Sequence, residues 1–336
     1  MQKLFIAIVA LIALVIIIGF SLPRYTRVEV SDTIDANPAT VFALINDLER
    51  AALWSPVVSA DPNARIVYSG PQRGIGATMT WDGAIAGTGV QVITESVPWE
   101  RVTVSMNPGE VSEALTVFEI SRAAGGSEVV ARYEADHGYR LTSRVLGLIV
   151  RQVFRRDFEQ GLASLREIAE SLPRADFGDL EIEHLSVEAI DIAYLSATSP
   201  PEPAAMSEAL GDAYFEVLGF IDEHGLTEAG APLSILRGFV GSSMNFDAAI
   251  PVRGLDPATP RDGSPVRIGR TYAGPVIRVK HVGSYRTLGE TQRKIASYLA
   301  ALGIERNGDA WESYVSDPTK VAESDLITYV YYPVKP

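Results

Sequence analysis

Glu312 is the residue whose type and surroundings point most directly to chemistry. The segment Trp311–Val315 reads as a strand, in which Glu312 and Tyr314 share one face and Trp311 and Ser313 share the other. A carboxylate in an aromatic cleft loses hydration, which raises its pKa and its basicity. The same group beside tyrosine rings suits a flat cation. Glu312 is therefore a candidate binding or catalytic residue, although a solvent-exposed glutamate on an edge strand would leave the same pattern.

Metal chemistry is not indicated by the remaining reactive residues. The chain has no cysteine, which excludes disulfides, thiolate nucleophiles and cysteine-bound metals. Its four histidines lie far apart, with no pair at the spacing of metal ligands: His137, His184, His224 and His281. We therefore expect neither a metal nor a cofactor.

The region around Glu312 is the second copy of an internal repeat. Gly225 and Gly230 recur as Gly303 and Gly308, at a constant offset of 78 residues. Each copy reads strand, helix, strand, strand, so two copies would form a pseudo-two-fold sheet with both helices on one face and a cleft between the halves. The first copy has Ser234 where the second has Glu312, and this predicts an asymmetric cleft with one carboxylate.

The preceding region, residues 27–172, predicts a cavity between a sheet and a helix. A strand over residues 27–34 precedes a short helix that starts at Asn37-Pro38, and β-rich stretches fill residues 65–135. A long amphipathic helix follows over residues 143–172. Trp54, Trp81 and Trp99 are candidates for the cavity wall, and no nucleophile–base pair is visible. Binding of an apolar ligand is the expected role of this region.

The first residues predict a membrane anchor. Residues 4–22 form an apolar run without a charge, long enough to span roughly 28 Å as a helix. A cleaved signal peptide is the alternative, with Gly19 and Ser21 near a cleavage site. We expect a single-pass N-terminal anchor with the domains outside the cytoplasm, although the flanking positive charges leave the sidedness open.

Length and charge define the remaining expectations. The 336 residues predict two domains, and a net charge of −13 without a basic cluster argues against a nucleic-acid partner. The fold class is α+β, with an N-terminal transmembrane helix, a helix-grip domain and a duplicated strand-helix-strand-strand domain. The expected boundaries are an anchor over residues 1–26, a first domain over 27–172, a linker over 173–180 and a second domain over 181–336.

The first domain resembles the SRPBCC superfamily of START-like, polyketide cyclase/dehydrase-like proteins. The stretches that carry the resemblance are DTIDANPATVFALINDLERAALWSP, YSGPQRGIGATMTWDG and DFEQGLASLREIAE. The resemblance implies a helix-grip fold around a ligand cavity. It implies little about a reaction, because the superfamily includes lipid carriers, hormone receptors and cyclases.

The second domain resembles the GyrI-like small-molecule-binding family, which also occurs as the effector-binding domain of bacterial multidrug-responsive regulators. The most specific motifs are His281-x-Gly283-x-Tyr285, Trp311-Glu312-x-Tyr314 and Asp317-Pro318. The resemblance implies that Glu312 lies in the cleft, as an anchor for a cationic ligand or as the general base of a hydrolase.

Aromatic residues are expected to wall this cleft. The resemblance implies that Tyr285, Tyr314 and Trp311 are wall residues, although Trp311 faces away from Glu312 on the strand and is alternatively a core residue. Tyr329 alternates with Thr328 and Val330 on another predicted strand, so it adds aromatic surface.

These observations predict a membrane-anchored protein that binds small hydrophobic or cationic molecules in an SRPBCC cavity and a GyrI-like cleft. Two alternatives stay open. One is a hydrolase that detoxifies electrophilic small molecules with Glu312 as general base. The other is a ligand-responsive regulatory adaptor that acts through an unidentified protein partner.

Overall fold

The computed structural model describes residue 14 and residues 17–56, 58, 61–106, 114–255 and 264–336. The chain divides into two compact units, with the division after Gly178. Both units are mixed α+β, and each contains one antiparallel sheet.

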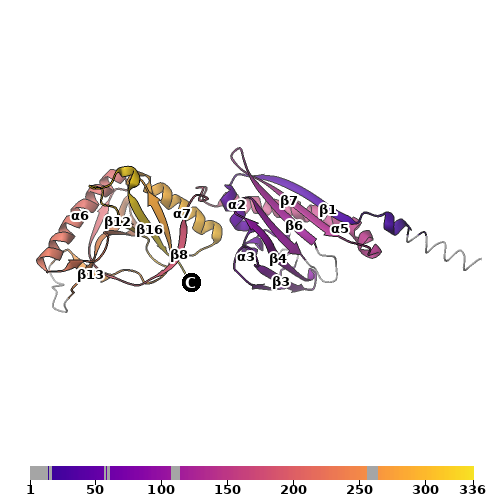
Figure 1. The fold of residues 1–336 in the computed structure, drawn as a ribbon, viewed down its shortest axis with the longest axis horizontal. Helices are drawn as coiled ribbons and strands as arrows, with labels where there is room; N and C mark the ends of the chain where they lie inside the picture. The colour runs from indigo at the N-terminus through magenta and orange to yellow at the C-terminus, as the bar shows by residue number, and fades with distance from the viewer. Residues whose placement is uncertain (1–13, 15–16, 57, 59–60, 107–113, 256–263) are drawn as a thin grey trace, which may run out of the picture. The chain divides into compact units, whose positions relative to one another are not determined.

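The first unit is a seven-stranded antiparallel sheet that packs against a long helix (Figure 1). The strand order is β1-β7-β6-β5-β4-β3-β2. The strands are β1 (Tyr25–Ile34), β2 (Arg65–Ser69), β3 (Thr78–Gly83), β4 (Gly87–Val97), β5 (Arg101–Met106), β6 (Ala114–Ala123) and β7 (Gly126–Asp136). The helices are α2 (Pro38–Ile45), α3 (Leu48–Ala51) and α5 (Leu141–Ser171).

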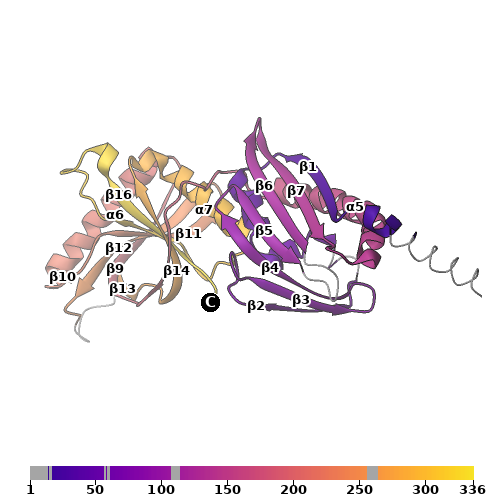
Figure 2. The same ribbon diagram turned by 45° about the vertical axis from the view of Figure 1, so that its right-hand side comes forward.

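The long helix α5 closes the core of this unit. Figures 1 and 2 show α5 lying along the sheet beside β1 and β7. Its residues Leu162 and Leu165 are fully buried against the sheet, with Phe154 and Phe158 on the same stripe. The short helix α2 begins with Pro38 in its first turn, and the Asn37 side chain makes no capping bond but donates to the Arg174 carbonyl.

The predicted membrane anchor is wrong for the part of the chain that the structure describes. No helix among those residues is both long and apolar enough to cross a membrane. Most of the predicted span of residues 4–22, namely residues 4–13 and 15–16, lies outside the described residues. The described fold is therefore α+β without the predicted N-terminal transmembrane helix. The predicted single-pass membrane localisation is not supported either.

The second unit contains a nine-stranded antiparallel sheet and two helices. Its main path runs β13-β9-β12-β11-β15-β16-β14-β8, and β10 pairs with β12. The strands are β8 (Ile182–Val187), β9 (Asp191–Ser199), β10 (Thr227–Glu228), β11 (Leu233–Val240), β12 (Ser243–Arg253), β13 (Arg267–Arg270), β14 (Gly274–Val282), β15 (Trp311–Tyr314) and β16 (Ile327–Pro333). The helices are α6 (Pro203–Glu223) and α7 (Leu288–Leu302), with 3-10 turns η1 (Tyr285–Thr287) and η2 (Glu323–Asp325).

The duplication is visible in the strand order of this sheet. One half contains β9, β12 and β11 with helix α6, and the other contains β14, β16 and β15 with helix α7. The halves meet where β11 pairs with β15, and there Ser234 is directly opposite Glu312. The pseudo-two-fold axis therefore passes between these two residues, which occupy equivalent positions in the repeat.

The two faces of this sheet bury different sets of side chains. The helix-covered face includes Ile277, Val330 and Ile250, which pack with residues of α7 or α6 (Figures 1 and 2). The opposite face buries Trp311 and Ile192 in a separate cluster. Because strand residues alternate between faces, Glu312 lies on the helix side of the sheet.

Candidate functional site

The second unit contains a cleft of about 900 Å³ between its two helices. The floor comes from the central strands β11 and β15, and the walls come from α6, η1 and the start of α7. The side chains that line the cleft include Tyr214, Ser234, Tyr285, Gln292, Glu312 and Tyr314.

Glu312 is a buried carboxylate at the floor of this cleft, with 5% of its surface exposed. Its Oε1 accepts a hydrogen bond from Gln292 Nε2 at 2.5 Å, and its Oε2 accepts one from the Tyr314 hydroxyl at 2.6 Å. Both donors are neutral. No Lys, Arg or His of the described residues forms an ion pair with Glu312. The negative charge is therefore not compensated within the described residues.

Burial dominates the electrostatics of Glu312. It raises the pKa of the carboxyl group, while the hydrogen bonds from Tyr314 and Gln292 lower it by a smaller amount. Burial and the negative charge of Glu312 raise the pKa of the Tyr314 hydroxyl well above its ordinary value, so Tyr314 stays a proton donor. Glu312 therefore stays protonated to a higher pH than an exposed glutamate does.

Tyr285 reaches the cleft through a turn that follows β14. Its ring contacts the Tyr314 ring edge to face, with 5.3 Å between the centroids. The turn is held by His281, whose Nε2–H donates to the Ser284 carbonyl at 3.2 Å and whose Nδ1 lies 2.9 Å from Thr291 Oγ1. The His281-x-Gly283-x-Tyr285 motif thus positions an aromatic wall residue.

Trp311 and Tyr329, the other two predicted aromatic residues, do not line the cleft. Trp311 stacks on Tyr331 on the opposite face of the sheet, with 4.8 Å between the ring centroids and an interplanar angle of 6°. Tyr329 pairs with Ser313 across β15 and β16, so it shares that opposite face, where Arg278 covers its ring. The structure therefore brings together Glu312, Tyr314 and Tyr285 of the five predicted site residues.

Tyr214 is a cleft residue that the sequence did not single out as functional. It lies on α6, and its hydroxyl is buried without a hydrogen-bond partner in the described part of the chain. Burial, and then the charge of Glu312, raise its pKa. In the sequence, Tyr214 belongs to the apolar stripe of a helix, and only its hydroxyl distinguishes it from a core residue.

Charged residues of both signs lie at the edge of the cleft. Arg286, Arg293 and Glu290 are exposed lining residues. Asp317 also lines the cleft, and its hydrogen bonds from Lys320 and Thr319 lower its pKa. None of these four charged side chains forms an ion pair with Glu312. The edge charges therefore do not neutralise the carboxylate at the floor of the cleft. No group of metal-ligating side chains occurs among the described residues.

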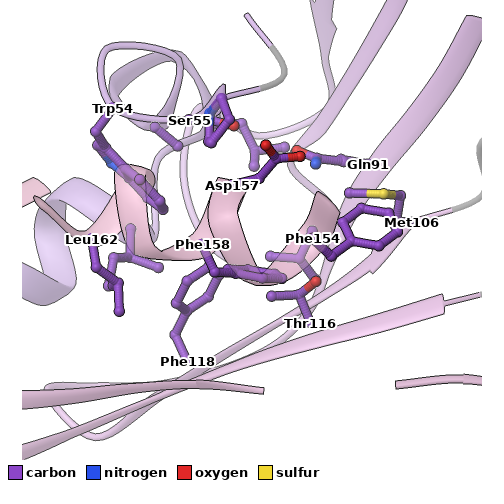
Figure 3. A pocket seen from close by; sticks show the side chains of 16 residues that line it. Trp54, Ser55, Gln91, Met106, Thr116, Phe118, Phe154, Asp157, Phe158 and Leu162 are labelled. Atoms are coloured by element: carbon purple, nitrogen blue, oxygen red, sulfur yellow. The ribbon is translucent and has the colours of Figure 1, made fainter. Parts of the chain in front are cut away.

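The first unit has a smaller cavity of about 90 Å³ between α5 and the sheet (Figure 3). Its walls are mostly apolar and aromatic, and include Trp54, Phe118, Phe154 and Phe158. Of the three tryptophans proposed as wall residues, Trp54 lines this cavity. Trp81 and Trp99 pack in the core of the unit instead.

A family model described as "Polyketide cyclase / dehydrase and lipid transport" matches residues 25–170. This match confirms the predicted resemblance of the first domain to the SRPBCC superfamily. The comparison with curated proteins found no match.

Several solved structures are similar to parts of the chain. The C-terminal domain of EcmrR is 13% identical, with a TM-score of 0.38 over 47% of this chain and 98% of its own. The di-domain ARO/CYC StfQ from the steffimycin biosynthetic pathway is 15% identical, with a TM-score of 0.35 over 44% of this chain and 51% of its own. An EcmrR–DNA complex is 12% identical, with a TM-score of 0.41 over 58% of this chain and 71% of its own.

These structures define neither the ligand nor the reaction of this chain, because all three TM-scores are below 0.5.

Proposed function

We propose that the second unit binds a small hydrophobic cation in its cleft, with Glu312 as the counter-charge. The observation that carries this proposal is a buried carboxylate that, among the described residues, receives hydrogen bonds only from the neutral groups of Gln292 and Tyr314. A buried carboxylate without a cationic partner is unfavourable, so it either takes up a proton or meets a cation. A cationic ligand supplies that missing partner.

The walls and size of the cleft agree with an apolar, flat ligand. The rings of Tyr214, Tyr285 and Tyr314 line the cleft together, and tyrosine faces attract cations. A volume of about 900 Å³ also falls in the usual range for small-molecule sites, roughly 300–1,000 Å³. The first unit adds a separate cavity, and we propose that the protein holds small molecules in both units.

Binding of a planar cation to the full chain tests this proposal. The probes are ethidium and the uncharged phenanthridine, whose ring systems match, measured by calorimetry. Glu312→Gln is expected to weaken ethidium binding about tenfold or more, because it removes a charge-assisted contact in a buried site. Phenanthridine binding should stay unchanged.

Glu290→Gln is the matched control, because Glu290 lines the same cleft but is exposed. It should change ethidium binding by no more than about twofold. The proposal fails if both substitutions have the same effect, or if ethidium binds Glu312→Gln as tightly as the unaltered protein.

A hydrolase is the second candidate function, favoured by the raised pKa of Glu312. In that reaction Glu312 takes a proton from water while the water oxygen attacks an electrophilic carbon of the ligand, and the bond to the leaving group breaks. Product analysis of electrophilic compounds that bind the cleft tests it. Turnover that disappears in Glu312→Gln, while binding of neutral compounds persists, would support hydrolysis.

A further inference from the structure

The cavity of the first unit contains a carboxylate, Asp157, that has no bonding partner among the described residues. Asp157 lies on α5 and lines the cavity together with Phe154 and Phe158 of the same helix. Within the described ranges, Asp157 takes part in no hydrogen bond or ion pair, and it is the only titratable side chain that lines the cavity. Burial raises its pKa, and the neighbouring Arg156 lowers it less.

The local packing explains why this carboxylate is partly buried. Gly161 lies one helical turn after Asp157 on the same flank of α5. A side chain at Gly161 would place its Cβ 3.2 Å from Pro56 Cδ, so the glycine lets the segment around Trp54 and Pro56 pass close to the helix. That segment covers the flank of α5 where Asp157 lies, and Trp54, Ser55 and Pro56 all line the cavity.

A second polar group in the cavity also lacks a partner. Thr116 on β6 is 4% exposed, and its Oγ1 has no hydrogen-bond partner within the described residues. Figure 3 shows Asp157 and Gln91 among the side chains that line the cavity, together with the rings of Phe118, Phe154 and Phe158. The cavity therefore combines one negative group, one free hydroxyl and an aromatic wall.

We propose that this cavity is a binding site for a small hydrophobic amine. Its ammonium group pairs with Asp157, and its apolar part packs on Phe118, Phe154 and Phe158. The partly buried carboxylate repels anionic ligands, and a neutral apolar ligand would take water away from it without supplying a partner. The volume of about 90 Å³ limits the enclosed part to one small ring or a short chain, since a cavity of about 150 Å³ accommodates benzene. This inference rests on the proposal that the first unit holds a small molecule, and it is independent of the function proposed for the second unit.

Three probes that differ only in their polar group test the inference on the full chain. They are benzylamine, benzyl alcohol and toluene, followed by the ¹H–¹⁵N NMR signals of the tryptophan indoles. Trp54 is the reporter, because its indole N–H donates to the Leu44 carbonyl and its ring lines the cavity. We expect the Trp54 signal to shift, with benzylamine binding about tenfold more tightly than benzyl alcohol.

Asp157→Asn should remove the preference for the amine and leave benzyl alcohol binding unchanged. Glu159→Gln is the matched control, because Glu159 is an exposed carboxylate two residues further along α5 and should keep the preference. If Asp157→Asn does not fold, a pH titration of the unaltered protein replaces it: benzylamine binding should weaken as Asp157 is protonated, and benzyl alcohol binding should not. The inference is overturned if the three probes bind equally, if the amine preference survives Asp157→Asn, or if the Trp54 signal responds to none of them.

Discussion

At the scale of single residues, the properties of Glu312 come from a competition between burial and hydrogen bonding. Burial raises the pKa of its carboxyl group more than Tyr314 and Gln292 lower it. A folded-state pKa above the unfolded value means that the folded protein holds its proton to a higher pH. As the pH rises through the unfolded pKa, the unfolded chain loses its proton first, and the folded state loses stability until the pH passes the folded pKa.

Glu312→Gln should therefore stabilise the ligand-free protein at high pH. At about pH 8 we expect the variant to have a higher free energy of unfolding than the unaltered protein, since each unit by which the folded pKa exceeds the unfolded pKa corresponds to about 1.4 kcal/mol. At about pH 3 the two proteins should differ little, because the carboxyl group is then largely neutral in both states. Urea unfolding at both pH values measures the difference, and an equal difference at the two values would contradict this assignment.

Tyr214 offers a second test at this scale. Its hydroxyl is buried without a partner in the described residues, so Tyr214→Phe removes no hydrogen bond. We expect the free energy of unfolding to change by less than about 0.5 kcal/mol or to increase. Tyr314→Phe is the comparison, because it removes the bond to Glu312 Oε2 and should raise the pKa of Glu312 further. Equal losses of stability in the two variants would show that Tyr214 has a partner after all.

At the scale of elements, the turn between β14 and α7 decides where Tyr285 lies. Gly283 has a φ of 125°, which side chains rarely adopt, and its N–H donates to the Leu326 carbonyl. The turn then continues into η1, where the Ser284 side chain accepts from the Arg286 N–H. The position of the aromatic wall thus depends on backbone geometry at one glycine.

Gly283→Ala should destabilise the protein by about 1–3 kcal/mol, because alanine is strained at this φ. Among the described residues beyond its chain neighbours, the added Cβ would meet only Thr287 Oγ1 within 4 Å. Gly219→Ala, in α6, is the opposite control: its Cβ meets open space, so helix propensity should stabilise the protein by up to about 1 kcal/mol. Thermal unfolding of the two variants measures the expected loss of stability in Gly283→Ala and the expected gain in Gly219→Ala. If Gly283→Ala were neutral, the turn would have relaxed, and cation binding should then weaken through displacement of Tyr285.

At the scale of the whole molecule, the net charge of −13 acts on any charged ligand. A negative field attracts cations over distances of about a Debye length, roughly 10 Å at 0.1 M salt. It speeds the association of a cationic ligand more than it changes the contacts in the bound state.

The association rate of ethidium should therefore fall severalfold when the salt concentration rises tenfold, while its dissociation rate changes little. Stopped-flow fluorescence gives both rates. Phenanthridine serves as the uncharged control and should show no salt dependence of association. A salt effect confined to dissociation would mean that contacts within the cleft, and not the field of the chain, respond to ions.

Much of the fold could be predicted from the sequence, because hydrophobic periodicity and turn residues act locally. The long helix predicted over residues 143–172 is α5, Leu141–Ser171, and the repeat at offset 78 appears as two strand-helix-strand-strand halves. Local hydrophobicity gave a wrong prediction at the N-terminus. There the apolar run of residues 4–22 predicted a membrane span, and no described helix is long and apolar enough to form one.

The sequence by itself determined which residues share a face, since alternation along β15 separates Glu312 and Tyr314 from Trp311 and Ser313. Only the tertiary structure decided which face is the cleft and what else reaches it. Tyr214 and Gln292 line the cleft with Glu312 from two different helices. Asp157 is partly covered because Gly161 lets the segment around Pro56 pass close to α5. Such contacts join residues far apart in the chain, and they depend on packing geometry that no local pattern encodes.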